Sequence, residues 1–270
     1  MSDDRLLSPR NPWFTGSVGI TVILLAATAL GGFVLLPYAQ PDLKLAGIWD
    51  AICSAAGVPK ASSAADPVQP ESKLTRVVVT SALPSAADPE AVGRGATLAQ
   101  QCAICHGPTG VSRADSPNLA GQYAPAVYKQ LADFKAGVRV NATMTPFAVN
   151  LSERDMADLS AYYAFLPRLP GFHPASDKPP PRIVINGAPL RNIAPCGSCH
   201  GVLDNKTGSP WLEGQPAAYV KAQLQAFASG ARRNDISQQM RNVARRMTSE
   251  EIDQAAEWYA SQPSTRVHTQ

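Results

Sequence analysis

Two copies of the motif Cys-x-x-Cys-His hold four of the five cysteines in this 270-residue chain. Residues three apart face the same side of a helical turn, so both thiols can form thioethers with the two vinyl groups of one porphyrin. The histidine that follows can then supply an axial nitrogen to the iron. The spacing therefore predicts two c-type haem attachment sites. Their residues are Cys102, Cys105 and His106 in the first copy and Cys196, Cys199 and His200 in the second.

Two other uses of paired cysteines fit the chain less well. A thioredoxin-like redox pair needs strands that alternate with helices, and no stretch here shows the sustained alternation of a strand. A zinc site would need four ligands from one motif or from both motifs together. Since both motifs lie in matching segments, we favour haem over either alternative.

Methionine is the best candidate for the sixth ligand of each iron. Met144 and Met240 occupy corresponding places after the two histidines, just before the last predicted helix of each segment. Ligation by one histidine and one methionine leaves no open position on the iron and suits reversible one-electron transfer. The other internal methionines, Met156 and Met247, align with apolar residues and are expected to pack in the core. His173 and His268 have no counterparts and are expected at the surface.

Each axial histidine also needs an acceptor for its second ring nitrogen. Pro117 and Pro210 follow the two histidines in corresponding loops, and the carbonyl oxygen of each is a candidate acceptor. An ordinary loop proline is the alternative at both positions.

The segments around the motifs repeat each other. Leu-Ala-Gly-Gln at 119–122 recurs as Leu-Glu-Gly-Gln at 212–215, and Gln-Leu-x-x-Phe-x-x-Gly at 130–137 recurs at 223–230. A repeat that keeps its offset over this length indicates a tandem duplication. Helix signals recur as well. They are the N-cap Asp88 with Pro89, the capping boxes Ser152/Asp155 and Thr248/Glu251, and the helix-ending glycines Gly137 and Gly230.

The N-terminal part of the chain predicts a membrane anchor. Residues 11–41 contain no charged side chain, and residues 18–36 are nearly all apolar. At 1.5 Å per residue such a helix crosses the hydrocarbon core of a bilayer. A cleaved secretory signal is the alternative, but its apolar region is usually shorter and ends at a small-x-small site. We therefore expect lipid contact over residues 13–38, with Trp13, Phe14 and Tyr38 at the interfaces.

Composition and the Pro-rich stretches suggest how the chain divides into segments. With 17% charged residues and a formal charge of +3, a nucleic-acid binder is excluded. We expect a short tail and the anchor in 1–40, a membrane-proximal segment and Ala/Ser/Pro-rich linker in 41–87, a first domain in 88–168, a Pro-rich connector in 169–182 and a second domain in 183–270. Residues 41–58 could form a short amphipathic helix. Cys53 is expected to be an inert apolar side chain there, with an intermolecular disulfide or partner contact as the alternative.

The order Cys-x-x-Cys-His-Gly, Pro-x-Leu-x-Gly-Gln, Gln-Leu-x-x-Phe-x-x-Gly and then methionine resembles the class I cytochrome c unit. Two units over residues 88–263 resemble the dihaem cytochrome c4 family. The resemblance implies an all-α chain, with a transmembrane helix followed by two tandem class I cytochrome c domains. It implies that the four motif cysteines attach two haem c groups, that His106, Met144, His200 and Met240 bind iron, and that Pro117 and Pro210 orient the histidines. It also implies a cytoplasmic N-terminus and periplasmic haem domains at the bacterial inner membrane.

These patterns predict a tethered carrier of single electrons in a respiratory chain. We expect transfer from a quinol-oxidising complex to a terminal oxidase or reductase, as a mobile carrier or a complex subunit, with no catalytic residue, nucleic acid or small-molecule substrate. The alternative is a dihaem peroxidase-like enzyme with one open haem iron. Arginines cluster around the second methionine, either to neutralise haem propionates or to steer an acidic partner. They are Arg232, Arg233, Arg241, Arg245 and Arg246.

Overall fold

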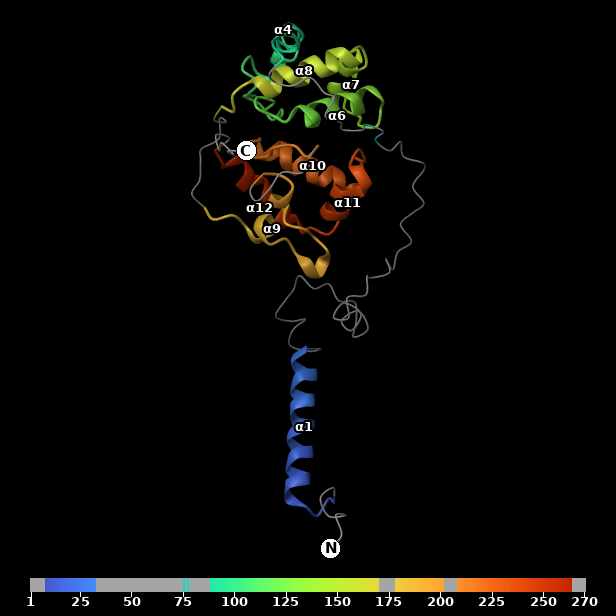
Figure 1. The fold of residues 1–270 in the computed structure, drawn as a ribbon, viewed down its shortest axis with the longest axis vertical. Coiled ribbons are helices and arrows are strands. Elements are labelled where there is room, and N and C mark those ends of the chain that lie inside the picture. The colour runs from blue at the N-terminus through green and yellow to red at the C-terminus, as the bar shows by residue number, and fades with distance from the viewer. Residues whose placement is uncertain are drawn as a thin grey trace. The chain divides into compact units, whose positions relative to one another are not determined.

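The computed structural model of the chain describes residues 8–32, 75, 77, 88–169, 178–201 and 208–263. The chain divides into two compact units, Met1–Val68 and Gln69–Gln270. Helices account for the regular structure of the described residues (Figure 1), whose one β pairing is an isolated bridge between Ala188 and Ile193. The expectation of a helical chain is therefore confirmed.

The first unit contributes one described helix, α1 (Pro12–Leu30). It begins earlier than the apolar run because Asn11 caps it, accepting a hydrogen bond from the backbone N–H of Trp13 at 3.0 Å, and Pro12 fits the first helical turn. None of its residues is buried. Its length and composition would allow it to cross a membrane, and a signal sequence has the same properties. Residues 33–36 of the predicted span and Tyr38 lie outside the described part of the chain.

The first repeat, residues 88–168, contains α4 (Pro89–Leu98), α5 (Ala103–His106), α6 (Ala124–Lys135), α7 (Met144–Ala148) and α8 (Glu153–Phe165). Asp88 caps α4, and Ser152 and Asp155 form the predicted capping box at α8. At Gly95 a Cβ atom would lie 2.2 Å from the carbonyl oxygen of Asp158, so only glycine allows α4 to approach α8 this closely. The core beneath them includes Leu151, Met156, Leu159 and Tyr163.

The second repeat, residues 182–263, follows the same plan with a shorter first helix. Its helices are α9 (Arg182–Ile185), α10 (Ala217–Ser229), α11 (Gln239–Ala244) and α12 (Ser249–Ala260), with short 3₁₀ turns at Pro189–Arg191, Cys196–Ser198 and Ile236–Gln238. Thr248 and Glu251 form the predicted capping box at α12. Gly230 ends α10 with a φ of 76°, as Gly137 does after α6 with 68°. Figure 1 shows α9–α12 as one group of helices and α4–α8 as another.

The two repeats meet at a seam built from corresponding residues. Gln122 accepts from the backbone N–H of Trp211 at 2.6 Å and donates to its carbonyl at 3.0 Å. Gln215 does the same to the backbone of Asn118, at 2.9 and 2.7 Å. Since these pairs are equivalent in the repeat, the seam has local two-fold symmetry.

One side of the seam carries a buried polar cluster that the other side lacks. Asp133, 1% exposed, accepts from Lys129 Nζ at 2.5 Å and from Asn234 Nδ2 at 2.8 Å. Lys129 also donates to the carbonyl of Asn234 at 2.5 Å. The hydroxyl of Thr75, which precedes the first repeat, donates to the other oxygen of Asp133 at 2.6 Å. At the equivalent positions of the second repeat, Ala222 and Ala226 replace the lysine and the aspartate.

Several predictions concern residues that the structure does not describe. They are the helix over 41–58, most of the linker over 59–87, Cys53, His173 and His268. These remain predictions.

Candidate haem sites

The first motif wraps into one helical turn. Cys102 precedes α5, and its carbonyl accepts from the backbone N–H of His106 at 3.0 Å. His106 is 5% exposed, and its Nδ1 lies 2.8 Å from the carbonyl oxygen of Pro117. A carbonyl can only accept, so Nδ1 carries the proton and Nε2 keeps its lone pair for a metal. Burial lowers the pKa of His106 more than the Pro117 carbonyl raises it, which keeps the ring neutral.

The second motif reaches the same arrangement from a different backbone. Its cysteines lie on a 3₁₀ turn, yet His200 N–H again bonds the carbonyl of Cys196 at 3.0 Å. Nδ1 of His200, which is 8% exposed, lies 2.9 Å from the carbonyl oxygen of Pro210. Burial lowers the pKa of His200, and the positive charge of Arg232 adds to this shift.

The four motif cysteines are free thiols. Burial raises the pKa of Cys102, and it raises the pKa of Cys196 to about 12. A thioredoxin-like pair depends on a lowered thiol pKa, so these cysteines do not suit that chemistry. Among the described residues no three side chains of His, Cys, Asp or Glu come together as a metal cluster, so the zinc alternative also lacks its donors there.

The methionines separate by burial. Met156 and Met247 are buried in the cores of the first and second repeats, as predicted. Met144 opens α7, where its backbone N–H is held by Asn141 Oδ1 at 2.9 Å, and its side chain is half-buried. Met240 lies in α11 and is also half-buried, packed against the edge of the second core. Met144 and Met240 are therefore the methionines that remain accessible to a bound group.

The donor set of each repeat fits haem c. Each repeat offers two free thiols, a buried neutral histidine whose Nδ1 is occupied, and a half-buried thioether. When bound, haem c supplies an iron that cycles between ferric and ferrous states. The protein contributes attachment, axial ligands and the orientation of the histidine ring.

The predicted arginine cluster is only partly a surface feature. Arg241 is buried, and its guanidinium forms an ion pair with Asp235 at 2.7 Å, so a docking face that includes Arg241 is wrong. Arg232 lies at the seam, where it bonds Gln130 and Gln223. The seam residues were not predicted as functional, although Gln122 and Gln215 belong to the repeated Leu-x-Gly-Gln motif that could have indicated them.

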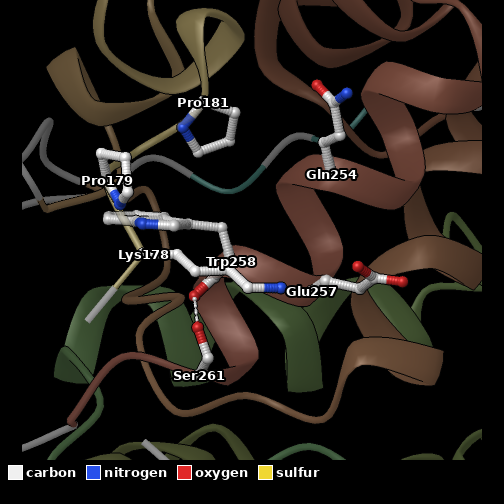
Figure 2. A pocket seen from close by; sticks show the side chains of 7 residues that line it. All are labelled: Lys178, Pro179, Pro181, Gln254, Glu257, Trp258 and Ser261. Atoms are coloured by element: carbon white, nitrogen blue, oxygen red, sulfur yellow. Dashed lines mark hydrogen bonds between the residues drawn. The ribbon is translucent and has the colours of Figure 1, made fainter. Parts of the chain in front are cut away.

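A separate open pocket of about 340 Å³ lies on the second repeat (Figure 2). It contains no predicted haem residue, and it shows where the end of the connector packs on α12. Ser261 beside it donates to the carbonyl of Trp258 at 2.9 Å. The lining residues are Lys178, Pro179, Pro181, Gln254, Glu257, Trp258 and Ser261.

Comparison with known proteins supports this interpretation of the sites. The cytochrome c family model matches residues 92–164. The chain is 38% identical over 172 residues to a thiosulfate dehydrogenase electron acceptor of Stutzerimonas stutzeri, an alignment that covers 60% of this chain and 79% of the relative. It is 37% identical over 183 residues to cytochrome c4 of Thiocapsa roseopersicina, covering 63% and 91%.

A solved structure agrees with these relatives. Reduced recombinant cytochrome c4 from Pseudomonas stutzeri superposes with a TM-score of 0.58 at 30% identity, covering 63% of this chain and 98% of that one. The resemblance that the motifs indicated is confirmed, and with it the covalent cofactor. The chain belongs to the cytochrome c4 family of electron carriers and holds two haem c groups.

Proposed function

We propose that the chain is a membrane-tethered dihaem cytochrome that passes single electrons in a respiratory chain. Cys102 and Cys105 attach one haem and Cys196 and Cys199 attach the other. His106 with Met144, and His200 with Met240, occupy both axial positions of each iron, so no site remains for a substrate. The observation that carries this proposal is the histidine–proline contact at 2.8 and 2.9 Å, which recurs in both repeats although their backbones differ.

The carbonyls of Pro117 and Pro210 act on the histidines in two ways. Each fixes the ring orientation, and each holds the proton on Nδ1, so Nε2 stays directed at the iron. Because the contact is made by the main chain, it does not depend on the charge of a side chain.

We place the tether in α1, with the N-terminus in the cytoplasm and both repeats in the periplasm of a bacterial cell. The support is the uncharged, mostly apolar and unburied surface of α1, together with assembly on the outer side of the bacterial inner membrane, which the family implies. A tether keeps the carrier near membrane partners and raises its effective concentration there.

The electron donor is a quinol-oxidising complex, and the acceptor is a terminal oxidase or reductase. A second donor is favoured by one of the similar proteins, whose name describes it as the electron acceptor of thiosulfate dehydrogenase. We infer that this chain also takes electrons from a periplasmic dehydrogenase of that class. Both roles use the same haems.

The decisive experiment measures ligation in the detergent-solubilised full chain. We expect a mass increase of two haems, a methionine-to-ferric-iron charge-transfer band with the intensity of two sites, and no carbon monoxide binding to the reduced protein. Met144→Ala and Met240→Ala should each remove half of the band, whereas the buried control Met156→Leu should keep it. A high-spin haem in the wild-type protein would favour the peroxidase-like alternative instead.

Partner choice needs a separate measurement. Stopped-flow reduction by a quinol-oxidising complex and by a thiosulfate dehydrogenase with thiosulfate would rank the two donors. Failure of both, with intact ligation, would reject the donors and leave the electron-carrier chemistry in place.

A further inference from the structure

The loops that lead to the two proposed methionine ligands differ in length. Six residues separate Gly137 from Met144 in the first repeat, whereas nine separate Gly230 from Met240 in the second. The second repeat therefore places its methionine at the end of a longer loop. Two features of this loop, its backbone conformation and a buried ion pair, have no counterpart in the first repeat.

Two residues just before Met240 have left-handed backbone conformations. Ser237 has a φ of 51° and Gln238 has a φ of 59°. A residue with a Cβ atom is disfavoured in this region because its Cβ approaches the following carbonyl oxygen. In the loop 138–143, all of which the structure describes, no residue has a positive φ. The turn before Met240 is therefore strained, and such a turn persists only where other contacts hold it.

A buried ion pair holds the strained turn closed. Asp235 and Arg241, which are 8% and 4% exposed, lie on either side of the turn in the chain. One carboxylate oxygen of Asp235 accepts from Arg241 Nε at 2.7 Å, and the other accepts from the backbone N–H of Arg241 at 2.9 Å. The second bond also caps α11, since the N-cap residue Gln238 makes no side-chain cap. The pair therefore fixes the helical turn that carries Met240.

The first repeat positions its methionine with a neutral side chain instead. Asn141 is exposed, and its Oδ1 accepts from the backbone N–H of Thr143 at 3.0 Å and of Met144 at 2.9 Å. Water can replace such bonds at the surface, but it cannot replace a buried carboxylate. In the described part of the chain Asp235 is the one carboxylate paired with Arg241, whose Nη2 is buried there without a hydrogen bond. The second methionine therefore depends on one ion pair.

We propose that Asp235 and Arg241 are positioning residues for the second haem site, and that they keep Met240 in place as the sixth ligand against the strain of the preceding turn. This inference rests on the proposed ligation by Met240. We call the pair the methionine latch. When the latch is broken, Ser237 and Gln238 can leave the left-handed region, α11 loses its cap and Met240 withdraws. Withdrawal of Met240 leaves one axial position of the second iron open to another ligand, whereas the first iron keeps its methionine.

The test uses the detergent-solubilised full chain, with the methionine-to-ferric-iron charge-transfer band and titration with imidazole as readouts. Asp235→Ala and Arg241→Gln should each remove half of the band. One haem of each variant should bind imidazole about tenfold more tightly than in the wild type, because apparent affinity follows the fraction of iron with an open position. Glu251→Gln is the matched control. It breaks the ion pair with Arg191 at the start of α12, in the same repeat, and should keep the full band.

Two further variants separate positioning from a general loss of structure. Asp235→Asn keeps an acceptor oxygen for the backbone N–H of Arg241 but loses the charge, so it should lose less of the band than Asp235→Ala. Gln238→Gly relieves a left-handed residue, so it should weaken imidazole binding at the second haem about threefold and restore part of the band when combined with Asp235→Ala. A substitution that tightens ligation cannot act by unfolding the loop, so it decides the matter even if the alanine variant does not hold two haems.

The results distinguish failure of the latch from failure of the proposed ligation. A two-site band that survives in both Asp235→Ala and Arg241→Gln would overturn the latch and leave Met240 as the ligand. A wild-type band with the intensity of one site, unchanged in Met240→Ala, would reject Met240 as the ligand and the latch with it. An equal loss of band in Glu251→Gln would also overturn the proposal, as would a Gln238→Gly variant that binds imidazole more tightly than the wild type.

Discussion

The two repeats arrange their site residues in the same way, although the local backbone that carries them differs. In the first, the cysteine motif lies on an α-helix behind the ten-residue α4, whereas in the second it lies on a 3₁₀ turn behind the four-residue α9. Both nevertheless place a buried histidine against a proline carbonyl and open the last helix with a capping box. The comparison shows which contacts both repeats keep and which parts of the fold differ between them.

The surfaces near the two sites also diverged. Ile104, between the first pair of cysteines, is 84% exposed, and Val140 is 78% exposed. The equivalent positions of the second repeat carry Ser198 and Arg233. The first repeat therefore presents apolar side chains where the second presents polar and basic ones, and we expect the two to suit different partners.

We expect the largest loss of stability from changes in the buried polar cluster around Asp133, which has no counterpart in the second repeat. Asp133→Ala leaves the buried Lys129 without its carboxylate partner, although the carbonyl of Asn234 still accepts from it, and should cost about 4 kcal/mol of unfolding free energy. The double variant Lys129→Ala with Asp133→Ala reproduces the alanines of the second repeat and should cost less. Chemical denaturation followed by haem absorbance measures both. A double variant that is less stable than Asp133→Ala would contradict the idea that unpaired charge dominates.

The second prediction tests the close approach of α4 to α8 at Gly95. Gly95→Ala forces a Cβ to within 2.2 Å of Asp158 O and should destabilise the protein by about 3 kcal/mol. Gly93→Ala, in the same helix with no atom within 4 Å of the added Cβ, should be neutral or stabilise by about 0.5 kcal/mol. Thermal unfolding of the two variants side by side gives the answer. Equal melting temperatures would show that α4 can shift away from α8.

The third prediction compares the two capping boxes. The pKa of Glu251 is lowered because hydrogen bonds from Arg191 and Thr248 outweigh the effect of burial, and that of Asp155 is lowered by Ser152. A depressed carboxyl pKa contributes stability that is present above the unfolded value and lost as pH falls through the folded one. Glu251→Gln should therefore cost about 1 kcal/mol at pH 7 and flatten the acid limb of stability. Asp155→Asn, which lacks the arginine contact, should cost less.

The smallest effect concerns partner docking. Arg233→Gln with Arg246→Gln should slow reduction by an acidic partner about two- to threefold and weaken its salt dependence. Val140→Gln, at the position equivalent to Arg233, should leave the salt dependence unchanged. Stopped-flow measurement of the reduction rate over a range of ionic strengths distinguishes the double arginine variant from Val140→Gln. If the reduction rate of the double arginine variant depends on ionic strength as strongly as that of the wild type, the second repeat is not the docking face.

Local chemistry made much of this fold predictable. The helix starts after Asp88, Ser152 and Thr248 follow from capping side chains a few residues away, and these were found where expected. The repeat register likewise separated Met156 and Met247, which are buried, from the two half-buried methionines. The capping signal depends on residues that are close in sequence, and the methionine signal depends on the internal duplication.

Pairing between buried polar side chains was not predictable in the same way, whether the partners are close in sequence or far apart. Arg241 looked like a surface charge, yet it is buried and pairs with Asp235, in the loop just before α11. Lys129 and Asn234 are 105 residues apart, and nothing in either segment indicates the other. Such contacts depend on how the repeats pack, which residue types alone do not determine.

The bond from Thr75 to Asp133 would shorten the membrane tether that we propose through α1. It holds the chain at the seam well before α4 begins at Pro89, so the residues from Thr75 to Asp88 would add nothing to the distance between α1 and the haems. At about 3.4 Å per residue that removes roughly 40 Å of extended span. Under this proposal, the residues between α1 and Thr75 set the distance over which the haems can meet a membrane partner.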